Sequence, residues 1–174
     1  PDSVGSINSL TIVIDPQLWS GIVGDSLRNY FASPVEEIAG AREPIFDIQQ
    51  IPEDVFQGMT RAGRNILVVS TDHKNRFHIK DSLYAKGQKV AFLTGQTTDD
   101  LISEIQQYAP VIILSFKENE MREVENRFKQ TLNKTKAIEE RLGIQLTFPS
   151  LYHIVKQEGD FFWLERKVKN GTAD

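Results

Sequence analysis

A long segment, residues 97–142, constrains the fold of this 174-residue chain more than any other feature. Its apolar residues recur every three or four positions, the spacing that places them on one face of an α-helix. Glu118 lies four residues before Arg122, and further pairs of the same order follow, which stabilise a helix slightly. Pro110 falls inside the segment, so we expect a long helix in two parts, kinked or broken at that residue. Gly143 is expected to cap its C-terminus.

Short runs of β-forming residues precede and follow this helix. Residues 65–71 are almost continuously apolar, which is typical of a strand that is covered on both faces and central in its sheet. Further strands are expected at residues 8–15, 45–51, 76–80, 89–94 and 161–168.

Two shorter helices are expected between the strands. Asp15 precedes Pro16, and this pair favours a helix start because the Asp side chain caps free N–H groups and Pro suits the first turn. Residues 52–54 (Pro-Glu-Asp) are a second start signal. The buried side of this second helix is expected to consist of Val55, Phe56 and Met59.

These elements predict an α+β protein with a mixed or largely antiparallel sheet and the long kinked helix on one face. The specific topology that we expect is ferredoxin-like, βαββαβ, with a short inserted helix. One α+β domain is expected over residues 1–148. Residues 149–174 are expected to start a second unit, or to form a terminal hairpin cut short by the end of the chain. Asn170-Gly171 is a hairpin-turn signal, so a returning strand is expected beyond Asp174.

Charge and cysteine content exclude several classes of partner and site. The chain has 20 Lys and Arg against 24 Asp and Glu, a net charge of −4, and both signs mix along the long helix. A nucleic-acid-binding protein usually has a basic stripe, so we expect no nucleic-acid partner. With no Cys, the chain has no disulfide, no thiol nucleophile and no Cys-ligated metal. No run approaches the ~18 consecutive apolar residues of a transmembrane helix.

Residues that could carry chemistry are few and scattered. Asp72, His73, His78 and Asp81 offer metal-binding atoms, but their spacing matches no standard zinc pattern, and neighbours on a strand point to opposite faces. We interpret them as exposed polar residues and predict no metal site. The sequence has no Gly-x-Ser-x-Gly motif, and its adjacent acidic residues are typical of solvated surface, so we predict no catalytic residues.

Two further groups have a structural interpretation. Residues 95–100 (Gly-Gln-Thr-Thr-Asp-Asp) join a strand to a helix, where phosphate loops also lie. They lack a Gly-Lys-Ser/Thr ending and carry two acids that would repel an anion, so we expect a helix cap and no cofactor. Arg61, Arg64 and Lys74 flank the central strand and could meet an anionic group, although such a cluster is common by chance.

Aromatic residues near the C-terminus, together with Trp19, are expected in a core or an interface. If the returning strand is absent, part of this aromatic surface is exposed, and self-association through the strand that contains Phe161 and Trp163 is expected.

Several stretches together resemble a known family: SVGSIN at residues 3–8, LTIVID at 10–15, VGDSLRNYFASPV at 23–35, IPEDVF at 51–56, RNILVV at 64–69, KVAFLTG at 89–95 and FPSLYHIVKQEGDFFWLERK at 148–167. The family is an uncharacterised domain of bacterial cell-envelope proteins, found mainly in the Bacteroidetes.

The resemblance implies a lipoprotein-like protein of the cell envelope, periplasmic or on the outer membrane, whose lipid-bearing Cys is not in this sequence. A membrane contact would then come only through that anchor. The resemblance to the family identifies no functional residues in this chain. The expected function is that of a non-catalytic binding or structural protein with an unknown protein or small-molecule partner. The alternatives are a hydrolase-type enzyme whose site is completed by a further C-terminal part, and a small-ligand carrier.

Overall fold

The structure is a computed structural model that describes residues 1–36, 42–130, 132–133, 136–168 and 171–173. The chain forms two compact units, residues 1–122 and 123–174, and each is described by itself. The boundary expected after residue 148 lies further along the chain than this division.

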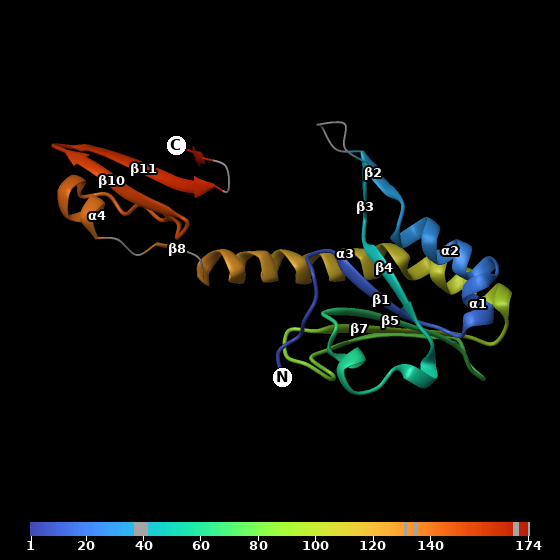
Figure 1. Ribbon diagram of the computed structural model, residues 1–174. Helices are drawn as coiled ribbons and strands as arrows, with labels where there is room; N and C mark the ends of the chain where they lie inside the picture. The colour runs from blue at the N-terminus through green and yellow to red at the C-terminus, as the bar shows by residue number, and fades with distance from the viewer. Residues whose placement is uncertain (37–41, 131, 134–135, 169–170, 174) are drawn as a thin grey trace. The chain divides into compact units, whose positions relative to one another are not determined.

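The first unit is built on a five-stranded sheet with the order β4-β1-β5-β7-β6 (Figure 1). Its strands are β1 (Ser9–Val13), β4 (Asp47–Ile51), β5 (Asn65–Thr71), β6 (Arg76–Asp81) and β7 (Lys89–Gly95). The neighbours β4, β1, β5 and β7 run parallel, and β6 runs antiparallel to β7. The apolar run of β5 is central as predicted, and its consecutive residues Ile66 and Leu67 are both fully buried.

The α+β class and the mixed sheet are confirmed, but the ferredoxin-like topology is wrong. The first unit runs β1-α1-α2-β2-β3-β4-η1-η2-β5-β6-β7-α3, and most of its strand pairs are parallel. Parallel strands need long crossover connections. Here helical segments lie in the connections between β1, β4 and β5, whereas strand β6 lies in the connection between β5 and β7. Strand patterns along a sequence do not show which strands become neighbours, so the topology could not be obtained from them.

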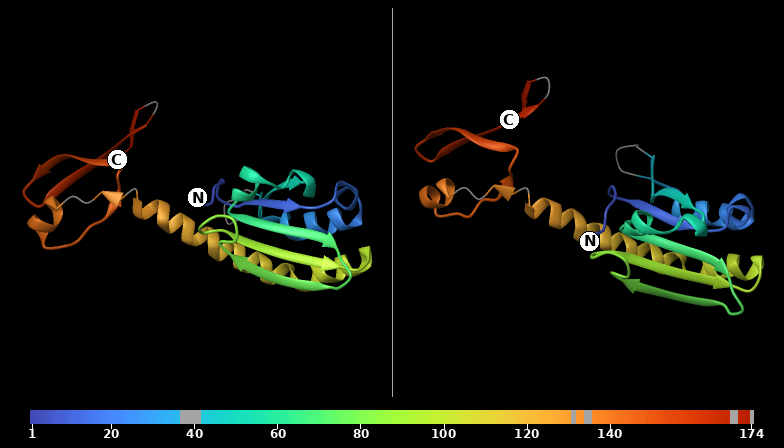
Figure 2. Two further views of the ribbon diagram at one scale, coloured as in Figure 1. Left: turned by 90° about the horizontal axis from the view of Figure 1, so that it is seen from below. Right: turned by 60° about the horizontal axis from the view of Figure 1, so that its bottom comes forward.

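Three helices cover one face of the sheet: α1 (Pro16–Ser20), α2 (Ile22–Phe31) and α3 (Thr98–Gln130), as the two views of Figure 2 show. The predicted N-cap of α1 is confirmed, because Asp15 accepts hydrogen bonds from the backbone N–H groups of Gln17 (2.7 Å) and Leu18 (3.3 Å). The main core between sheet and helices contains Leu10, Ile12, Ile14, Val23, Leu27, Phe31, Leu67, Leu93, Leu101, Ile105, Ile112 and Phe116.

Helix α3 differs from its prediction in two ways. It is one element from Thr98 to Gln130, so of the two outcomes expected at Pro110, a kink or a break, the break is excluded. The flanking residues Ala109 and Ile112 are fully buried, and this packing holds the helix together through the proline. The helix also ends before Leu142, and Gly143 caps a separate short helix, in a left-handed conformation (φ 65°).

Two 3-10 turns cover the other face of the sheet: η1 (Glu53–Val55) and η2 (Gly58–Ala62). Phe56 is buried as predicted, but Val55 and Met59 are exposed. The prediction for these two residues is wrong because short 3-10 turns do not share the face spacing of one α-helix. A short antiparallel pair, β2 (Pro34–Glu36) and β3 (Arg42–Pro44), precedes β4.

The second unit contains the end of α3, a short helix and small strands. They are β8 (Leu132–Asn133), α4 (Ala137–Leu142), β9 (Phe148–Pro149), β10 (Tyr152–Glu158), β11 (Phe161–Val168) and β12 (Gly171–Ala173). Strand β11 pairs antiparallel with both β10 and β12. A returning strand, β12, therefore lies within the chain, whereas it was expected beyond Asp174; Asn170 of the turn lies outside the described residues.

Candidate functional site

The four residues considered as metal ligands take part in other contacts. His73 is exposed in the turn after β5, where its backbone N–H donates to the Asp72 carboxylate (2.6 Å). The His78 ring stacks on Phe92, with 4.8 Å between ring centroids, and the Asp81 carboxylate pairs with Lys89. Among the described residues, no group of three or more His, Cys, Asp or Glu side chains could hold a metal ion.

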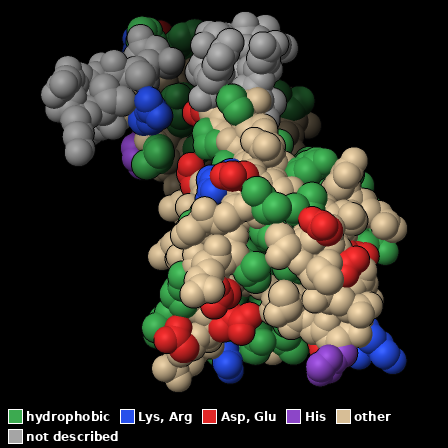
Figure 3. Space-filling model, turned by 90° about the vertical axis from the view of Figure 1, so that its right-hand side faces the viewer, with side chains coloured by type: hydrophobic (Ala, Val, Ile, Leu, Met, Phe, Trp, Pro, Cys, Tyr) green, Lys and Arg blue, Asp and Glu red, His purple; other side chains and the backbone are tan. Residues whose placement is uncertain are grey.

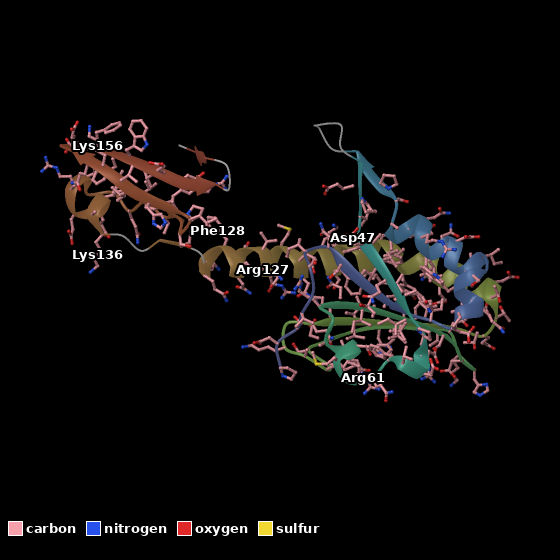
Figure 4. The ribbon with its side chains drawn as sticks, in the orientation of Figure 1. Asp47, Arg61, Arg127, Phe128, Lys136 and Lys156 are labelled. Atoms are coloured by element: carbon pink, nitrogen blue, oxygen red, sulfur yellow. The ribbon has the colours of Figure 1, made fainter. Side chains whose placement is uncertain are left out.

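The three basic residues that flank β5 are not brought together. Arg61 lies on η2 (Figure 4). Its guanidinium lies 5.4 Å from the ring centre of Phe56 and donates to the Phe56 carbonyl (3.0 Å). Arg64 immediately precedes β5, whereas Lys74 follows its far end, so the two lie at opposite ends of the strand. The three residues therefore do not form one cluster.

The turn at residues 95–100 is a helix cap, as predicted. The backbone N–H of Thr97 donates to the Asp100 carboxylate (3.0 Å), and the backbone N–H of Asp100 donates to the Thr97 hydroxyl (3.1 Å). This reciprocal pattern satisfies N–H groups at the start of α3 with the chain's own oxygens.

A buried polar network joins α3 to the beginnings of β1 and β5. The sequence patterns did not predict this network. The Arg64 Nε donates to Glu120 Oε1 (2.8 Å), and both side chains are almost completely buried. Asn65 Nδ2 donates to the same Glu120 oxygen (2.5 Å), while the backbone N–H of Asn8 donates to the other (2.7 Å). The carboxylate is thus matched by a cation and two amide donors, which offsets the cost of its burial.

A signal for Glu120 exists in the sequence. The fully buried positions of α3 include Ile105, Ala109, Ile112 and Phe116, and Glu120 continues this series at helical spacing. An acid that occupies the next position of an apolar stripe is a candidate for a buried, paired carboxylate.

Lys117 extends the network along α3. Its ammonium group donates to the Asn8 side-chain oxygen (2.8 Å) and to the Ile45 carbonyl (2.6 Å), and lies 4.6 Å from the Phe46 ring centre. Burial lowers the pKa of Lys117 below its ordinary value, and the nearby Glu120 carboxylate opposes that change. With two of its three donors bound to protein oxygens, this lysine positions the segment before β4 and the start of β1.

The cavities lined by described residues of the first unit include two of similar volume. One, of about 350 Å³, is lined by Asp15, Pro16 and residues 52–54. It lies at the carboxyl ends of β1 and β4, the end of a parallel sheet where ligands often bind. Acidic side chains (red) are visible on this end of the unit in Figure 3, and Asp15 already serves as a helix cap. The other cavity, of about 380 Å³, lies between the first residues of the chain, β1, β4 and η2.

The second unit exposes aromatic side chains on one face of its hairpin. Phe161 and Trp163 lie two positions apart on β11 and therefore on the same face, and their ring centres are 6.4 Å apart. Phe161 is 56% and Trp163 42% exposed. Lys156 is the register partner of Trp163, and Glu158 that of Phe161. We call these four residues the aromatic face; Figure 4 labels Lys156 on β10.

Comparison with known proteins identifies families and nothing finer. Residues 3–129 match the model of a family described as a domain of unknown function, DUF8532. The chain belongs to this family. Residues 131–174 match the model of a second family, likewise described as a domain of unknown function, DUF4837. The DUF8532 match ends near the division between the two units, and the expectation of an uncharacterised family is confirmed.

Neither the curated proteins nor the solved structures contain a significant match to the chain. Within the described ranges, no helix has both the length and the apolar character that crossing a membrane requires.

Proposed function

We propose that the chain is a non-catalytic structural module of the bacterial cell envelope, and that it associates with a second copy of itself through the aromatic face. The observation that carries this proposal is the exposure of Phe161 and Trp163 side by side on one face of the hairpin. Contiguous exposed aromatic surface is typical of interaction sites, because its removal from water favours association.

The charges on the aromatic face favour a second copy as the partner. Lys156 and Glu158 lie beside the rings and form an ion pair within one chain (2.9 Å). In a two-fold contact a surface meets itself in the reverse direction. A face with one cation and one anion can then place the lysine of each copy near the glutamate of the other.

Placement in the envelope is supported by the resemblance of the chain to bacterial envelope proteins, and a lipid anchor and a Bacteroidetes origin belong to the same proposal. Cell fractionation of the native host tests it. Recovery of the protein with the membrane fraction supports the placement, and recovery in the cytosol contradicts it.

The self-association is tested by sedimentation velocity of the chain over a wide range of concentrations. The unchanged chain is expected to form a dimer as concentration rises, and Trp163→Ser is expected to shift it to monomer. Ile22→Ser is the matched control, because Ile22 is an exposed apolar residue (58%) of the first unit. A chain that stays monomeric at all concentrations, or a control with the same effect, contradicts the proposal.

A charge exchange separates specific pairing from general stickiness of the rings. Lys156→Glu alone is expected to weaken the dimer, because a carboxylate at position 156 of each copy would then face the like-charged Glu158 of the other. The double variant Lys156→Glu/Glu158→Lys restores opposite charges and is expected to recover the dimer. Equal weakening by the single and the double variants contradicts a two-fold contact at this face.

A further inference from the structure

The 380 Å³ cavity belongs to the first unit, whereas the aromatic face belongs to the second, and it has features of a small-molecule site. Its volume falls within the range of about 300–1,000 Å³ that is common for such sites. Its floor includes Thr11 and Gln49, which are register partners on the parallel neighbours β1 and β4. Its walls come from the residues that precede β1 and from Met59, Thr60 and Gly63 of η2 and the following turn.

The lining is neutral and rich in groups that both donate and accept hydrogen bonds. None of the residues that line the cavity carries a charge. Hydroxyls come from Ser6, Ser9, Thr11 and Thr60, and an amide comes from Gln49. Such groups match the hydroxyl groups of a ligand, which also donate and accept. The apolar part of the lining is provided by Val4, Leu10, Ile51 and Met59.

Two polar side chains on the floor remain available to a ligand. Within the described residues, the side chains of Thr11 and Gln49 form no hydrogen bond, whereas the Ser9 hydroxyl donates to the Ser6 carbonyl (2.8 Å) and the Thr60 hydroxyl contacts backbone oxygens. Thr11 is half-buried and Gln49 is exposed. The donors and acceptors of both side chains can bond a ligand hydroxyl or water.

The walls of the cavity are held in place by the buried polar side chains. Arg64 Nη2 donates to the carbonyls of Gly5 (3.1 Å) and Ser6 (2.8 Å), and Gln88 Nε2 donates to the Gly63 carbonyl (2.6 Å). A site that is ordered before binding loses less entropy when a ligand enters. Gly63 also leaves the floor open, because a Cβ there would lie 3.2 Å from the Thr11 hydroxyl.

From this combination we infer that the cavity binds a neutral, polyhydroxylated small molecule of about the size of a monosaccharide. The absence of charge from the lining disfavours phosphates, carboxylates and amines, since nothing there would compensate their desolvation. Thr11 and Gln49 bind ligand hydroxyls, and the apolar wall contacts the C–H groups of the ring.

The test is an NMR titration of the ¹⁵N-labelled chain with D-glucose and with myo-inositol, with inorganic phosphate as the charged comparison. Saturable shifts are expected at the backbone amides of Thr11, Thr60 and Gly63 with at least one of the two neutral probes. Phosphate is expected to leave these amides unchanged. No saturable shift with either neutral probe, or a stronger response to phosphate, overturns the inference.

Two variants locate the site. Thr11→Val keeps the shape of the side chain but removes its hydroxyl, and is expected to weaken the binding several-fold. Gly63→Ala crowds the Thr11 hydroxyl and is expected to weaken it as well. Thr71→Val, at the exposed end of β5, is the matched control and is expected to bind as the unchanged chain does. Unchanged binding by both Thr11→Val and Gly63→Ala overturns the inference, and a monomeric Trp163→Ser chain that binds normally shows that the two proposals are independent.

Discussion

The two units of this chain treat their apolar residues differently. In residues 1–122, clusters of buried apolar side chains lie on both faces of the sheet. Among the described residues of 123–174, the buried apolar side chains are Ile138 and Phe148, while Leu146, Phe161 and Trp163 are exposed. A unit of this small size buries a smaller fraction of its surface and is only marginally stable by itself. The first unit is therefore stabilised by its own core, and the second depends more on a contact outside that core.

The two units also differ in how far water reaches an ion pair of each. The Arg64–Glu120 pair is almost inaccessible to water, and amide donors complete it. The Arg141–Asp160 pair of the second unit (3.1 Å) has both side chains more than half exposed, so water weakens it. A large core can enclose a polar network and fix one arrangement of its elements, whereas a small core leaves its ion pairs at the surface.

The largest effect is expected when the enclosed network loses its carboxylate. Glu120→Ala leaves the Arg64 charge buried without its ion-pair partner, and a loss of about 3–5 kcal/mol in the free energy of unfolding is expected. Urea unfolding of both variants measures this loss. Glu123→Ala, three residues along the same helix, removes the more exposed pair with Arg127 and is expected to cost about 0.5 kcal/mol or less. Similar costs for the two variants would contradict the assignment of Glu120 to a buried network.

The second unit is tested by removal of its buried aromatic side chain. Phe148→Ala is expected to cost about 3 kcal/mol, because it deletes one of the two buried apolar side chains described there. In an NMR spectrum, signals of residues 123–174 are expected to lose dispersion while those of 1–122 keep it. Leu146→Ala, at a neighbouring position that is 46% exposed, is the control and should leave both sets unchanged. Loss of dispersion in both units would show that they do not fold separately.

Local signals in the sequence predicted the elements whose cause is local. Asp15 and Pro16 begin α1 because capping atoms lie within three residues of each other. The apolar run of β5 identified a strand buried on both faces because neighbouring residues alternate between the faces. In both cases the residues that decide the structure are adjacent in the sequence, so their pattern was sufficient.

Other features depend on residues far apart in the chain, and these were missed. The charge of Glu120 is matched by Arg64 and Asn65, more than fifty residues away (56 and 55 positions), so its helix alone suggested a solvated face. The parallel pairing of β1 with both β4 and β5 likewise follows from the crossover connections, which no strand pattern contains. Of the candidate surfaces, the strand with Phe161 and Trp163 was identified from its composition, but the neutral cavity joins four separate segments.

A smaller effect is expected at the C-terminal cap of α4 in the second unit. Gly143 has φ 65°, a left-handed conformation that a residue with a Cβ adopts at a cost. Gly143→Ala is expected to lower the free energy of unfolding of this unit by about 1 kcal/mol, measured by urea unfolding. Gly21→Ala is the control, since Gly21 also ends a helix but has φ −103°, and its added Cβ meets only ordinary contacts. An equal loss in the free energy of unfolding for the two variants would contradict the role assigned to the left-handed conformation of Gly143.

The smallest effect is a pH dependence that belongs to the first unit. Burial lowers the pKa of Lys117 from its ordinary value of 10.5, with Glu120 opposing the shift. Between the lowered folded pKa and 10.5, the unfolded chain holds more protons at this lysine than the folded protein does, so its contribution to stability rises with pH in that window. Below the window the lysine is protonated in both states, and its contribution is constant. Urea midpoints measured at increasing alkaline pH are therefore expected to rise relative to those of Lys117→Met, which lacks the titrating group. A difference between the two proteins that stays constant, or falls, as pH increases would show that the ammonium group is not disfavoured by its surroundings, and the buried network would then end at Glu120.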